Sequence, residues 1–257
     1  TMRLCSIASG SSGNCIYVGS DTTHLLVDVG ISGKRAETGL RSLDISPNDL
    51  DGILITHEHS DHIAGIGVMA RKYGIPIYAT AGTIKAIQNA ASLGKIDEAL
   101  FVEVQEDSKF TIKDIVVNPM KISHDAAQPV AYRFGYGNRK AAICTDLGVF
   151  NEYTVEALRG MDALLIEANH DVNMLQVGPY PYYLKQRILG DRGHLSNERA
   201  GQLLCRLLHD KLQSIQLGHL SKENNLPELA YEAVRVEVTM SETDVRLNDI
   251  PMQVAKR

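Results

Sequence analysis

The sequence His57-Glu58-His59-Ser60-Asp61-His62 places three imidazoles and two carboxylates within six residues. It directly follows the apolar run Gly52-Ile53-Leu54-Ile55-Thr56, whose β-branched residues predict a buried strand. Open α/β sheets carry their chemistry where strands end, at the carboxyl edge of the sheet. Because chance clustering of this density in that context is rare, the sequence predicts a metal site rather than a polar turn.

The spacing within this stretch separates two pairs of potential ligands. In an extended backbone, His57 and His59 are two positions apart and point the same way, so both can bind one ion. Asp61 and His62 have the right chemistry to hold a second ion. Imidazole nitrogen suits zinc, manganese or iron, and a carboxylate favours an ion that keeps a reactive water. We therefore expect two divalent ions per chain, with zinc or manganese as first candidates and iron as a third.

The composition limits the class of protein. A chain of 257 residues that is 44% hydrophobic and 22% charged is typical of a soluble globular protein, and we expect one domain over residues 2–257. The net charge of -5 provides no global basic surface, which argues against a protein that coats DNA. Any contact with nucleic acid must then come from a local patch.

The cysteines and the apolar runs bear on location. The four cysteines lie far apart without C-x-x-C pairs, which argues against a disulfide framework or a zinc ribbon and favours a reducing cytoplasm. No apolar run approaches the roughly 20 residues that a membrane span needs, and no signal segment is present at the N-terminus. We expect a cytoplasmic protein without a membrane partner.

Short apolar runs and helical periodicities alternate along the chain. Strands are predicted at residues 4–8, 15–19, 24–29, 52–56, 77–79, 100–104, 110–112, 115–122, 130–135, 140–145, 163–167 and 214–218. Helices are predicted at residues 34–43, 63–73, within 83–93, 197–209 and 227–236. Ser196 and Asn225 are the expected N-caps of the last two. Strands followed by helices, twice over, indicate an α/β fold with two packed sheets and helices outside.

Three further ligands are predicted at later strand ends, because the four ligands of one loop cannot enclose two ions. His124 follows the strand at 115–122, Asp146 follows the strand at 140–145, and His219 follows the strand at 214–218. Each sits where a buried strand opens into a polar loop, as the first cluster does. Alone, each would more often be structural; beside the first cluster, each is a candidate ligand.

With these residues in place, the sequence resembles the metallo-β-lactamase fold hydrolases over nearly its whole length. Flanking segments resemble the YycJ/WalJ/VicX group within that fold, and they comprise Ala8-Ser9-Gly10-Ser11-Ser12-Gly13-Asn14, Leu26-Val27-Asp28-Val29-Gly30, Glu167-Ala168-Asn169-His170-Asp171, Gly193-His194-Leu195-Ser196-Asn197-Glu198 and Gly218-His219-Leu220-Ser221-Lys222-Glu223-Asn224-Asn225. Members of that group are described as cytoplasmic metal-dependent 5′-to-3′ DNA exonucleases.

The resemblance implies a four-layer αββα fold and a set of ligands. It implies His57, His59 and His124 on one ion. It implies Asp61, His62 and His219 on the other ion, with Asp146 bridging the two. The Pro-Gly-His signature of thioester hydrolases is absent at His124, and no insertion matches the tRNA-binding arm of the related endonucleases.

Two ions with these ligands suit phosphodiester hydrolysis without a Ser or Cys nucleophile. Asp61 can bind an ion and orient the attacking hydroxide. His194, at the start of a predicted helix, is the candidate proton donor to the departing oxygen, although a surface position flanking that helix is the alternative. Asp28 is either an acceptor for a ligand imidazole or a buried structural carboxylate.

The residues that would hold the substrate are less clear. Ser12 and Asn14 lie in a turn whose N–H groups and hydroxyls suit a phosphate, and a plain hairpin is an equal interpretation. His170 is either a contact to a terminal phosphate or a satisfied polar residue. The segment 179–187 mixes tyrosines with basic residues, so it suits base stacking, but we favour packing in the core. His24 and His209 are predicted to be structural.

Three functions fit these observations. The first is a dinuclear phosphodiesterase acting on DNA with a 5′ end. The second is a hydrolase of the same fold for a small ester, lactam, lactone or cyclic phosphodiester. The third is a metal-stabilised regulatory module without chemistry, which the seven-ligand set disfavours because a structural zinc site closes with four ligands. Protein partners are not predicted.

Overall fold

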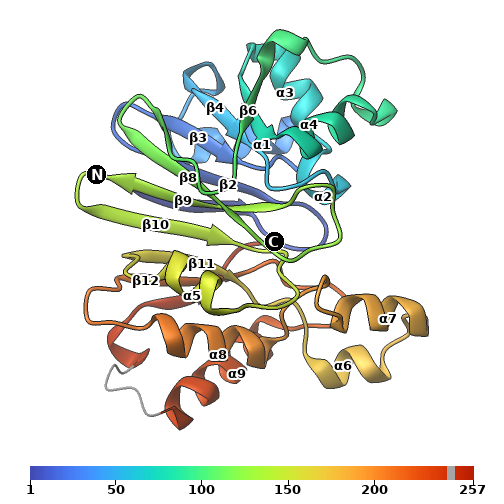
Figure 1. Cartoon of the computed structure of the whole chain (residues 1–257), viewed down its shortest axis with the longest axis vertical. Helices are drawn as coiled ribbons and strands as arrows, with labels where there is room; N and C mark the ends of the chain where they lie inside the picture. Colours follow the sequence, from blue (N-terminus) through green and yellow to red (C-terminus); the bar gives the residue numbers. More distant parts are fainter. Residues whose placement is uncertain (242–246) are drawn as a thin grey trace. The chain divides into compact units, whose positions relative to one another are not determined.

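The computed structural model describes residues 1–241 and 247–257, and the chain divides into two compact units. Unit 1 comprises Thr1–Lys121, Ala126–Asn138 and Lys256–Arg257, and unit 2 comprises Ile122–Asp125 and Arg139–Ala255. Figure 1 shows the whole chain coloured along the sequence. The single domain over residues 2–257 stays a prediction.

Unit 1 contains a six-stranded sheet in the order β1-β2-β3-β4-β5-β6. Its strands are β1 (Arg3–Ala8), β2 (Cys15–Gly19), β3 (His24–Val27), β4 (Gly52–Leu54), β5 (Ile77–Thr80) and β6 (Phe101–Val104). The first three strands are antiparallel, and β3 to β6 are parallel. Strand β4, which leads to the histidine cluster, is fully buried, as a central parallel strand requires.

The rest of unit 1 consists of an antiparallel meander and the helices of the first sheet. The meander is β7 (Phe110–Ile112), β8 (Ile115–Lys121) and β9 (Val130–Tyr136). The helices are α1 (Gly33–Ser42), α2 (Ser60–Ile63), α3 (Ile66–Tyr73) and α4 (Ala81–Gln88), with short 3₁₀ turns η1 (Pro47–Asp49), η2 (Ala91–Leu93) and η3 (Glu98–Leu100).

Unit 2 is built on four parallel strands in the order β10-β11-β12-β13. They are β10 (Arg139–Cys144), β11 (Ala163–Glu167), β12 (Ser214–Gly218) and β13 (Met252–Val254). The helices are α5 (Glu152–Leu158), α6 (Val172–Val177), α7 (Tyr182–Leu189), α8 (Asn197–Leu207) and α9 (Pro227–Met240), with a 3₁₀ turn η4 (Leu247–Asp249). Because the strands are parallel, their carboxyl ends lie at one edge of the sheet.

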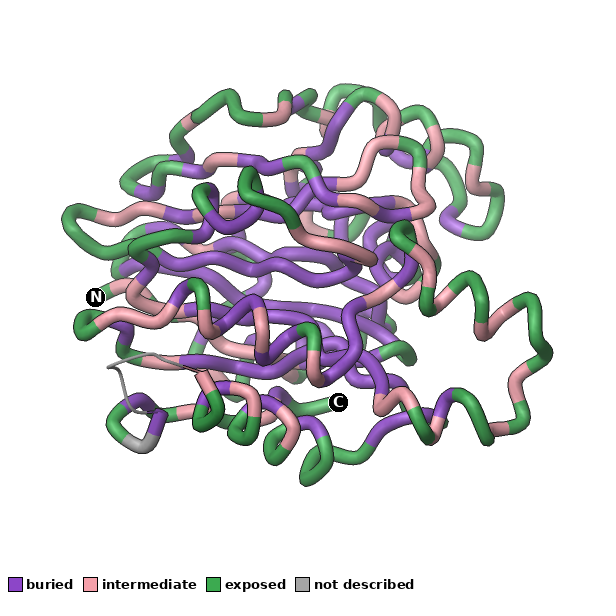
Figure 2. The backbone as a smooth tube through the Cα atoms, turned by 60° about the horizontal axis from the view of Figure 1, so that its bottom comes forward, coloured by how far each residue is buried: buried purple, intermediate pink, exposed green. Residues whose placement is uncertain are grey.

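The core of unit 1 lies between its sheet and its helices. Leu26, Ile53 and Ile77 from three neighbouring strands pack with Leu40 of α1 and Met69 of α3, and all five are buried. The buried strands are purple in Figure 2, whereas the outer helical turns are green. Removing this apolar surface from water stabilises the unit by roughly 25 cal/mol per Å².

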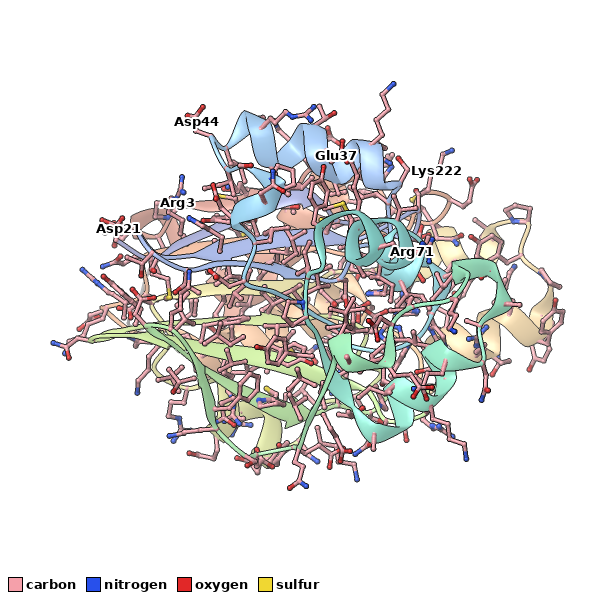
Figure 3. All side chains as sticks on the ribbon, turned by 90° about the horizontal axis from the view of Figure 1, so that it is seen from above. Arg3, Asp21, Glu37, Asp44, Arg71 and Lys222 are labelled. Atoms are coloured by element: carbon pink, nitrogen blue, oxygen red, sulfur yellow. The ribbon has the colours of Figure 1, made fainter. Side chains whose placement is uncertain are left out.

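A buried carboxylate also joins two helices of unit 1. Glu37 of α1, labelled in Figure 3, accepts hydrogen bonds from Lys72 Nζ at 2.6 Å and from the Tyr73 hydroxyl at 2.8 Å, both at the end of α3. These hydrogen bonds hold the pKa of Glu37 below its usual value. The next residue after Tyr73, Gly74, ends α3 with φ 63°, as the sequence predicts.

The predicted strands and helices are largely confirmed, but the sequence analysis did not predict α5, α6, α7 or β13. Three further corrections concern residues 63–73, residues 52–56 and the start of α9. The helix predicted at 63–73 is broken, because the Gly65 amide donates to Val29 O and a Cβ at Gly65 would lie 2.1 Å from Ile31 O. The strand predicted at 52–56 ends at Leu54, because the Thr56 amide donates to the Asp28 carboxylate instead of continuing the strand pairing.

The third correction concerns helix starts. Ser196 caps α8 as predicted, with Oγ accepting from the Arg199 amide at 3.2 Å. Asn225 is not the cap of α9, whose N-cap is Leu226. Instead, the Asn225 side chain is buried and exchanges two hydrogen bonds with Asn197. The Asn225 side chain therefore bonds to a residue distant in sequence, Asn197, instead of capping α9.

Candidate metal centre

Unit 1 gathers three imidazoles directly after β4. The ring centroids of His57 and His59 are 4.5 Å apart, and those of His57 and His62 are 4.1 Å apart. His57 and His62 are fully buried, whereas Asp61 is partly exposed with Oδ2 at 3.3 Å from His62 Nε2. The predicted donors of the first loop thus lie together within this unit.

Asp28 and Asn14 hold that loop in place. Asp28 Oδ2 lies 2.7 Å from His62 Nδ1, and its carboxylate also accepts from the Thr56 amide and hydroxyl, each at 2.8 Å. Asn14 donates from Nδ2 to Asp61 O at 3.2 Å, and its backbone amide donates to the same carbonyl. Asp28 therefore contacts the imidazole of His62, one of the predicted ligands. Burial raises the pKa of Asp28, against the lowering effect of His62.

Unit 2 gathers the later donors at the carboxyl edge of its sheet. Asp146 Oδ1 lies 3.3 Å from His219 Nε2 and 3.7 Å from His124 Nε2. Donor atoms from Asp146, Glu167, His194 and His219 all lie within 4.8 Å of one another. His124 Nδ1 faces Gly193 O at 3.0 Å, which fixes its ring. The strand ends predicted to supply ligands therefore meet within this unit.

Glu167 is a site residue that the sequence analysis missed. It ends β11, between the strands that deliver Asp146 and His219, so its strand-end position was the available signal. Its Oε1 lies 2.7 Å from His194 Nδ1 and 3.2 Å from His219 Nδ1. Its Oε2 accepts from the amides of Leu147 and Leu195. This fully buried carboxylate therefore orients two imidazoles at once.

The electrostatics of this cluster favour charge separation. Burial alone would raise the pKa of Glu167, but the charges and hydrogen bonds of His194 and His219 outweigh it and hold the pKa at about 2. Burial alone would lower the pKa of His194, but Glu167 and Asp146 raise it above its usual value. The buried Glu167 carboxylate therefore favours the protonated form of the neighbouring His194 imidazole.

Three site residues have left-handed backbone conformations. Asp28, Asp146 and His219 have φ of 60°, 59° and 55°. Asp28 directly follows β3, His219 directly follows β12, and Asp146 lies two residues after the end of β10. Non-glycine residues rarely adopt this conformation, and such strain concentrates at functional sites. Nothing in the sequence pattern indicated it.

The predicted substrate residues are not equivalent in the structure. Ser12 is exposed, whereas Asn14 is 4% exposed. The Asn14 side chain exchanges hydrogen bonds with the Gly10 backbone and donates to the Asp61 carbonyl in the loop of residues 57–62, called the metal loop below. His170 is buried, its Nδ1 faces Asn169 Oδ1 at 3.2 Å, and its Nε2 has no hydrogen-bond partner among the described residues. Burial lowers the pKa of His170 to about 4, so its imidazole is neutral near pH 7.

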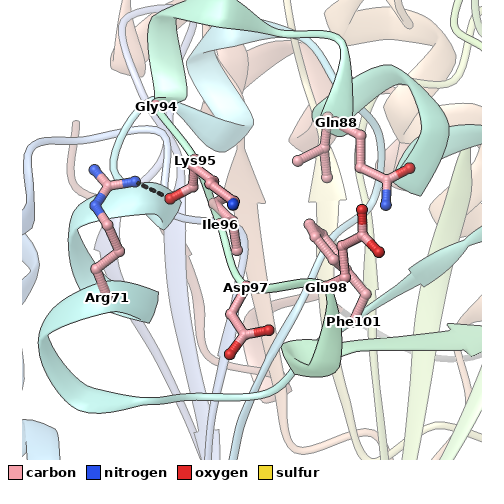
Figure 4. A pocket seen from close by; sticks show the side chains of 9 residues that line it. Arg71, Gln88, Gly94, Lys95, Ile96, Asp97, Glu98 and Phe101 are labelled. Carbon is pink, nitrogen blue, oxygen red and sulfur yellow. Dashed lines mark hydrogen bonds between the residues drawn. The ribbon is translucent and has the colours of Figure 1, made fainter.

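A surface cavity of about 860 Å³ lies elsewhere in unit 1. Its lining includes Arg71, Lys95, Asp97, Glu98 and Phe101, and none of the predicted site residues. In Figure 4, Arg71 donates to the Lys95 carbonyl at 3.1 Å across one side of it. Because none of the predicted site residues lines this cavity, the metal site proposed below does not include it.

The donor chemistry of both groups fits divalent metal ions. Unit 1 offers imidazoles from His57, His59 and His62 with the Asp61 carboxylate, and unit 2 offers imidazoles with the buried Asp146 carboxylate. Mixed nitrogen and carboxylate ligands suit zinc, manganese or iron. In each unit a buried carboxylate contacts the ring of a clustered histidine, with Asp28 at His62 in unit 1 and Glu167 at His194 in unit 2. Such carboxylates are usual neighbours of metal-binding histidines.

Comparisons with known proteins identify the family of this chain. A model of the β-lactamase superfamily domain matches residues 23–212. Exodeoxyribonuclease WalJ of Streptococcus pneumoniae is 46% identical over 225 residues, which cover 88% of this chain and 84% of that protein. Exodeoxyribonuclease YycJ of Bacillus anthracis is 43% identical over 228 residues, which cover 89% and 86%.

Solved structures show the same fold. The metallo-β-lactamase fold protein YhfI of Bacillus subtilis superimposes with a TM-score of 0.73 over 99% of this chain and 96% of that chain. Its sequence identity of 18% limits this likeness to the fold. Among the described residues, no helix combines the length and the apolar character needed to cross a membrane.

Proposed function

This chain belongs to the β-lactamase superfamily and to its WalJ/YycJ-like group, and on that premise we propose that it is a metal-dependent exonuclease that degrades DNA from a 5′ end. It is a hydrolase with the α/β metallo-β-lactamase fold. The four-layer arrangement of that fold stays a prediction. The observation that carries the proposal is the grouping of imidazole and carboxylate donors in each unit, in a chain whose close relatives are named exodeoxyribonucleases.

We assign the ions as the resemblance implies. His57, His59 and His124 would hold one ion, Asp61, His62 and His219 would hold the other, and Asp146 would bridge them. Chain connectivity supports grouping His124 with the first loop. The amide of Ala127 donates to the Glu58 carboxylate at 2.8 Å, and His124 precedes Ala127 by three residues, which span at most about 11 Å. Two ions per chain, with zinc or manganese as first candidates and iron as a third, belong to this proposal.

The residues of the chain have separate roles in hydrolysis. Divalent ions bound here would supply Lewis-acid activation of water and of the scissile phosphate. Asp61 accepts a hydrogen bond from the attacking water and orients it. His194 donates a proton to the departing oxygen, and Glu167 keeps that imidazole protonated and aimed, through the contact at 2.7 Å. Asp28 faces Nδ1 of His62 and fixes the orientation of that ring, which leaves Nε2 for a metal ion.

Three residues are candidates for contacts with the substrate, and they are Ser12, Asn14 and His170. Ser12 is exposed in its loop and available to a phosphate, whereas Asn14 supports the metal loop. A neutral His170 would contact a terminal phosphate by hydrogen bonding rather than by charge. The 5′ polarity and the cytoplasmic location come from the resemblance and are part of the same proposal.

A product analysis tests this function. The purified protein is incubated with single- and double-stranded DNA and RNA, labelled at either end, with zinc or manganese, and the products are sized. We expect mononucleotides or short products from the 5′ end of DNA, and loss of activity with a chelator. The His57→Ala variant should lose activity, and His209→Ala, at the end of α8, is its matched control.

Three outcomes would contradict the proposal. An active wild type whose His57→Ala variant is equally active would exclude the metal assignment. Turnover of a small ester, lactam or cyclic phosphodiester without any cleavage of DNA would favour the second function. A protein that binds two ions and cleaves nothing in a broad phosphoester screen would favour the regulatory module.

A further inference from the structure

The helix pair α6–α7 of unit 2 exposes aromatic rings to solvent. Tyr182 is 76% exposed, Tyr183 is 74% exposed, and Val177 at the end of α6 is 85% exposed. No residue of α7 is buried, and Leu175 is the buried residue of α6. Figure 1 shows the two helices projecting from the rest of unit 2. The sequence prediction that these tyrosines pack in the core is therefore wrong.

This pair is tied to the candidate site at the C-terminal end of α7. The His194 amide donates to Ile188 O at 3.0 Å, and Gly193, one residue earlier, supplies the carbonyl that faces His124 Nδ1. The Arg187 guanidinium donates to the Asp125 carboxylate, next to His124. A helix of eight residues is about 12 Å long, so the tyrosines at its first turn lie about one helix length from these contacts.

The chemistry of this surface suits an unpaired nucleic acid strand. Residues 172–193 contain three basic residues, Lys185, Arg187 and Arg192, and one acidic residue, Asp191, whereas the whole chain carries a net charge of -5. Because Arg187 is paired with Asp125, Lys185 is the cation of α7 that is not paired with a carboxylate in the described residues. Neighbouring aromatic side chains offer faces on which bases stack regardless of sequence, and cations beside them attract the phosphate backbone. The tyrosine hydroxyls tolerate water, so their exposure costs little when no strand is bound.

We propose that Tyr182 and Tyr183 form a stacking platform for unpaired bases of single-stranded DNA whose end occupies the metal site. The platform rests on the proposed nuclease function and adds its substrate class. Bases beyond the cleaved end stack on the exposed rings of α7, while the C-terminal end of the same helix holds the loops of His124 and His194. The strand is thereby guided from the platform to the site.

Binding measurements test the platform separately from cleavage. Fluorescence anisotropy of a labelled, 5′-phosphorylated oligothymidylate is measured with the full-length protein in chelator, so that no strand is cut. The Tyr182→Ala/Tyr183→Ala variant should raise Kd about 10-fold or more, and the Tyr182→Phe/Tyr183→Phe variant should bind as the wild type does. Tyr231→Ala, at a surface tyrosine of α9, is the matched control. Both target side chains are largely exposed, so we expect all variants to keep the wild-type melting temperature.

An abasic strand of the same length separates stacking from charge. It should bind the wild type as weakly as the thymidylate binds the alanine variant, and the alanine substitutions should not weaken it further. Equal Kd of the wild type and the alanine variant for the thymidylate would overturn the platform. An equal loss of affinity for the abasic strand would also overturn the platform.

Cleavage assays keep the two proposals distinguishable. If the alanine variant hydrolyses bis(p-nitrophenyl) phosphate normally but has a raised KM for single-stranded DNA, the platform is supported. A wild type that binds with the expected pattern and never cuts DNA would contradict the nuclease function while supporting the docking surface. A wild type that cuts DNA with a KM unaffected by the alanine substitutions would contradict the platform alone.

Discussion

Glu167 Oε1 lies 2.7 Å from His194 Nδ1, and this contact pairs a fully buried carboxylate with an imidazole that is 21% exposed. The pair joins the interior of unit 2 to a partly exposed imidazole. Because Nδ1 of His194 faces Glu167, Nε2 would be the nitrogen that faces a departing oxygen in the proposed mechanism. The buried partner would then decide which nitrogen of His194 donates the proton.

The substitution Glu167→Gln tests this pair. Gln keeps an oxygen for the amides of Leu147 and Leu195 but removes the charge that holds the proton on His194. We expect kcat for bis(p-nitrophenyl) phosphate to fall about 10- to 100-fold. The exposed Glu156→Gln on α5 is the control. A variant with full metal content and wild-type kcat would contradict the role of Glu167.

The substitution Asp28→Asn tests the support of His62. Asn tolerates the left-handed backbone at this position, so the turn after β3 should persist, while the charged acceptor of the His62 ring is lost. We expect metal affinity to fall about 10- to 100-fold, measured by metal content after dialysis against graded chelator. Asp21→Asn, at an exposed carboxylate, should retain its metal. Equal retention by both variants would show that Asp28 is only structural.

The substitution Gly30→Ala tests how tightly the metal loop is packed. A Cβ at Gly30 would lie 1.6 Å from the Asp61 carbonyl oxygen, so the loop with Asp61 and His62 must move. We expect a loss of stability of about 1–3 kcal/mol and a larger fractional loss of bound metal. Gly135→Ala in β9, where the nearest atom lies 3.8 Å from the added Cβ, is the control. Normal metal content in Gly30→Ala would show that the loop relaxes without cost.

The pH dependence of stability tests an exposed carboxylate away from the metal site. Hydrogen bonds from Thr23, Thr22 and Ser20 lower the pKa of Asp114 from 3.8 to about 2. A group whose folded pKa is depressed stabilises the protein above its unfolded pKa and loses that effect as the pH falls through the folded pKa.

We therefore expect the contribution of Asp114 to be present above about pH 4 and to vanish between about pH 4 and pH 2. In urea titrations, Asp114→Asn should be less stable than the wild type at pH 6, and the difference should narrow toward pH 2. A difference that stays constant over this range would contradict the lowered pKa of Asp114.

The sequence by itself determined the strand ends that carry the chemistry. Runs such as Gly52-Ile53-Leu54 are buried from end to end, and polar residues follow within a few positions, so periodicity and residue type sufficed to predict His57, Asp146 and His219 as candidate ligands. The α8 cap at Ser196 is a local interaction and was likewise predicted, because its hydrogen bond reaches only three residues along the chain.

Only the tertiary structure decided which polar groups meet and which rings stay exposed. In the sequence, Glu167 is an ordinary residue at the end of a predicted strand. Its contacts with His194 and His219 depend on how distant segments of the chain pack together. Clustered tyrosines such as Tyr182 and Tyr183 are more often found in a core. They are exposed here because no other described helix or strand buries a residue of α7. Local patterns encode the period of an element, whereas contacts between elements far apart in sequence depend on how the whole chain packs.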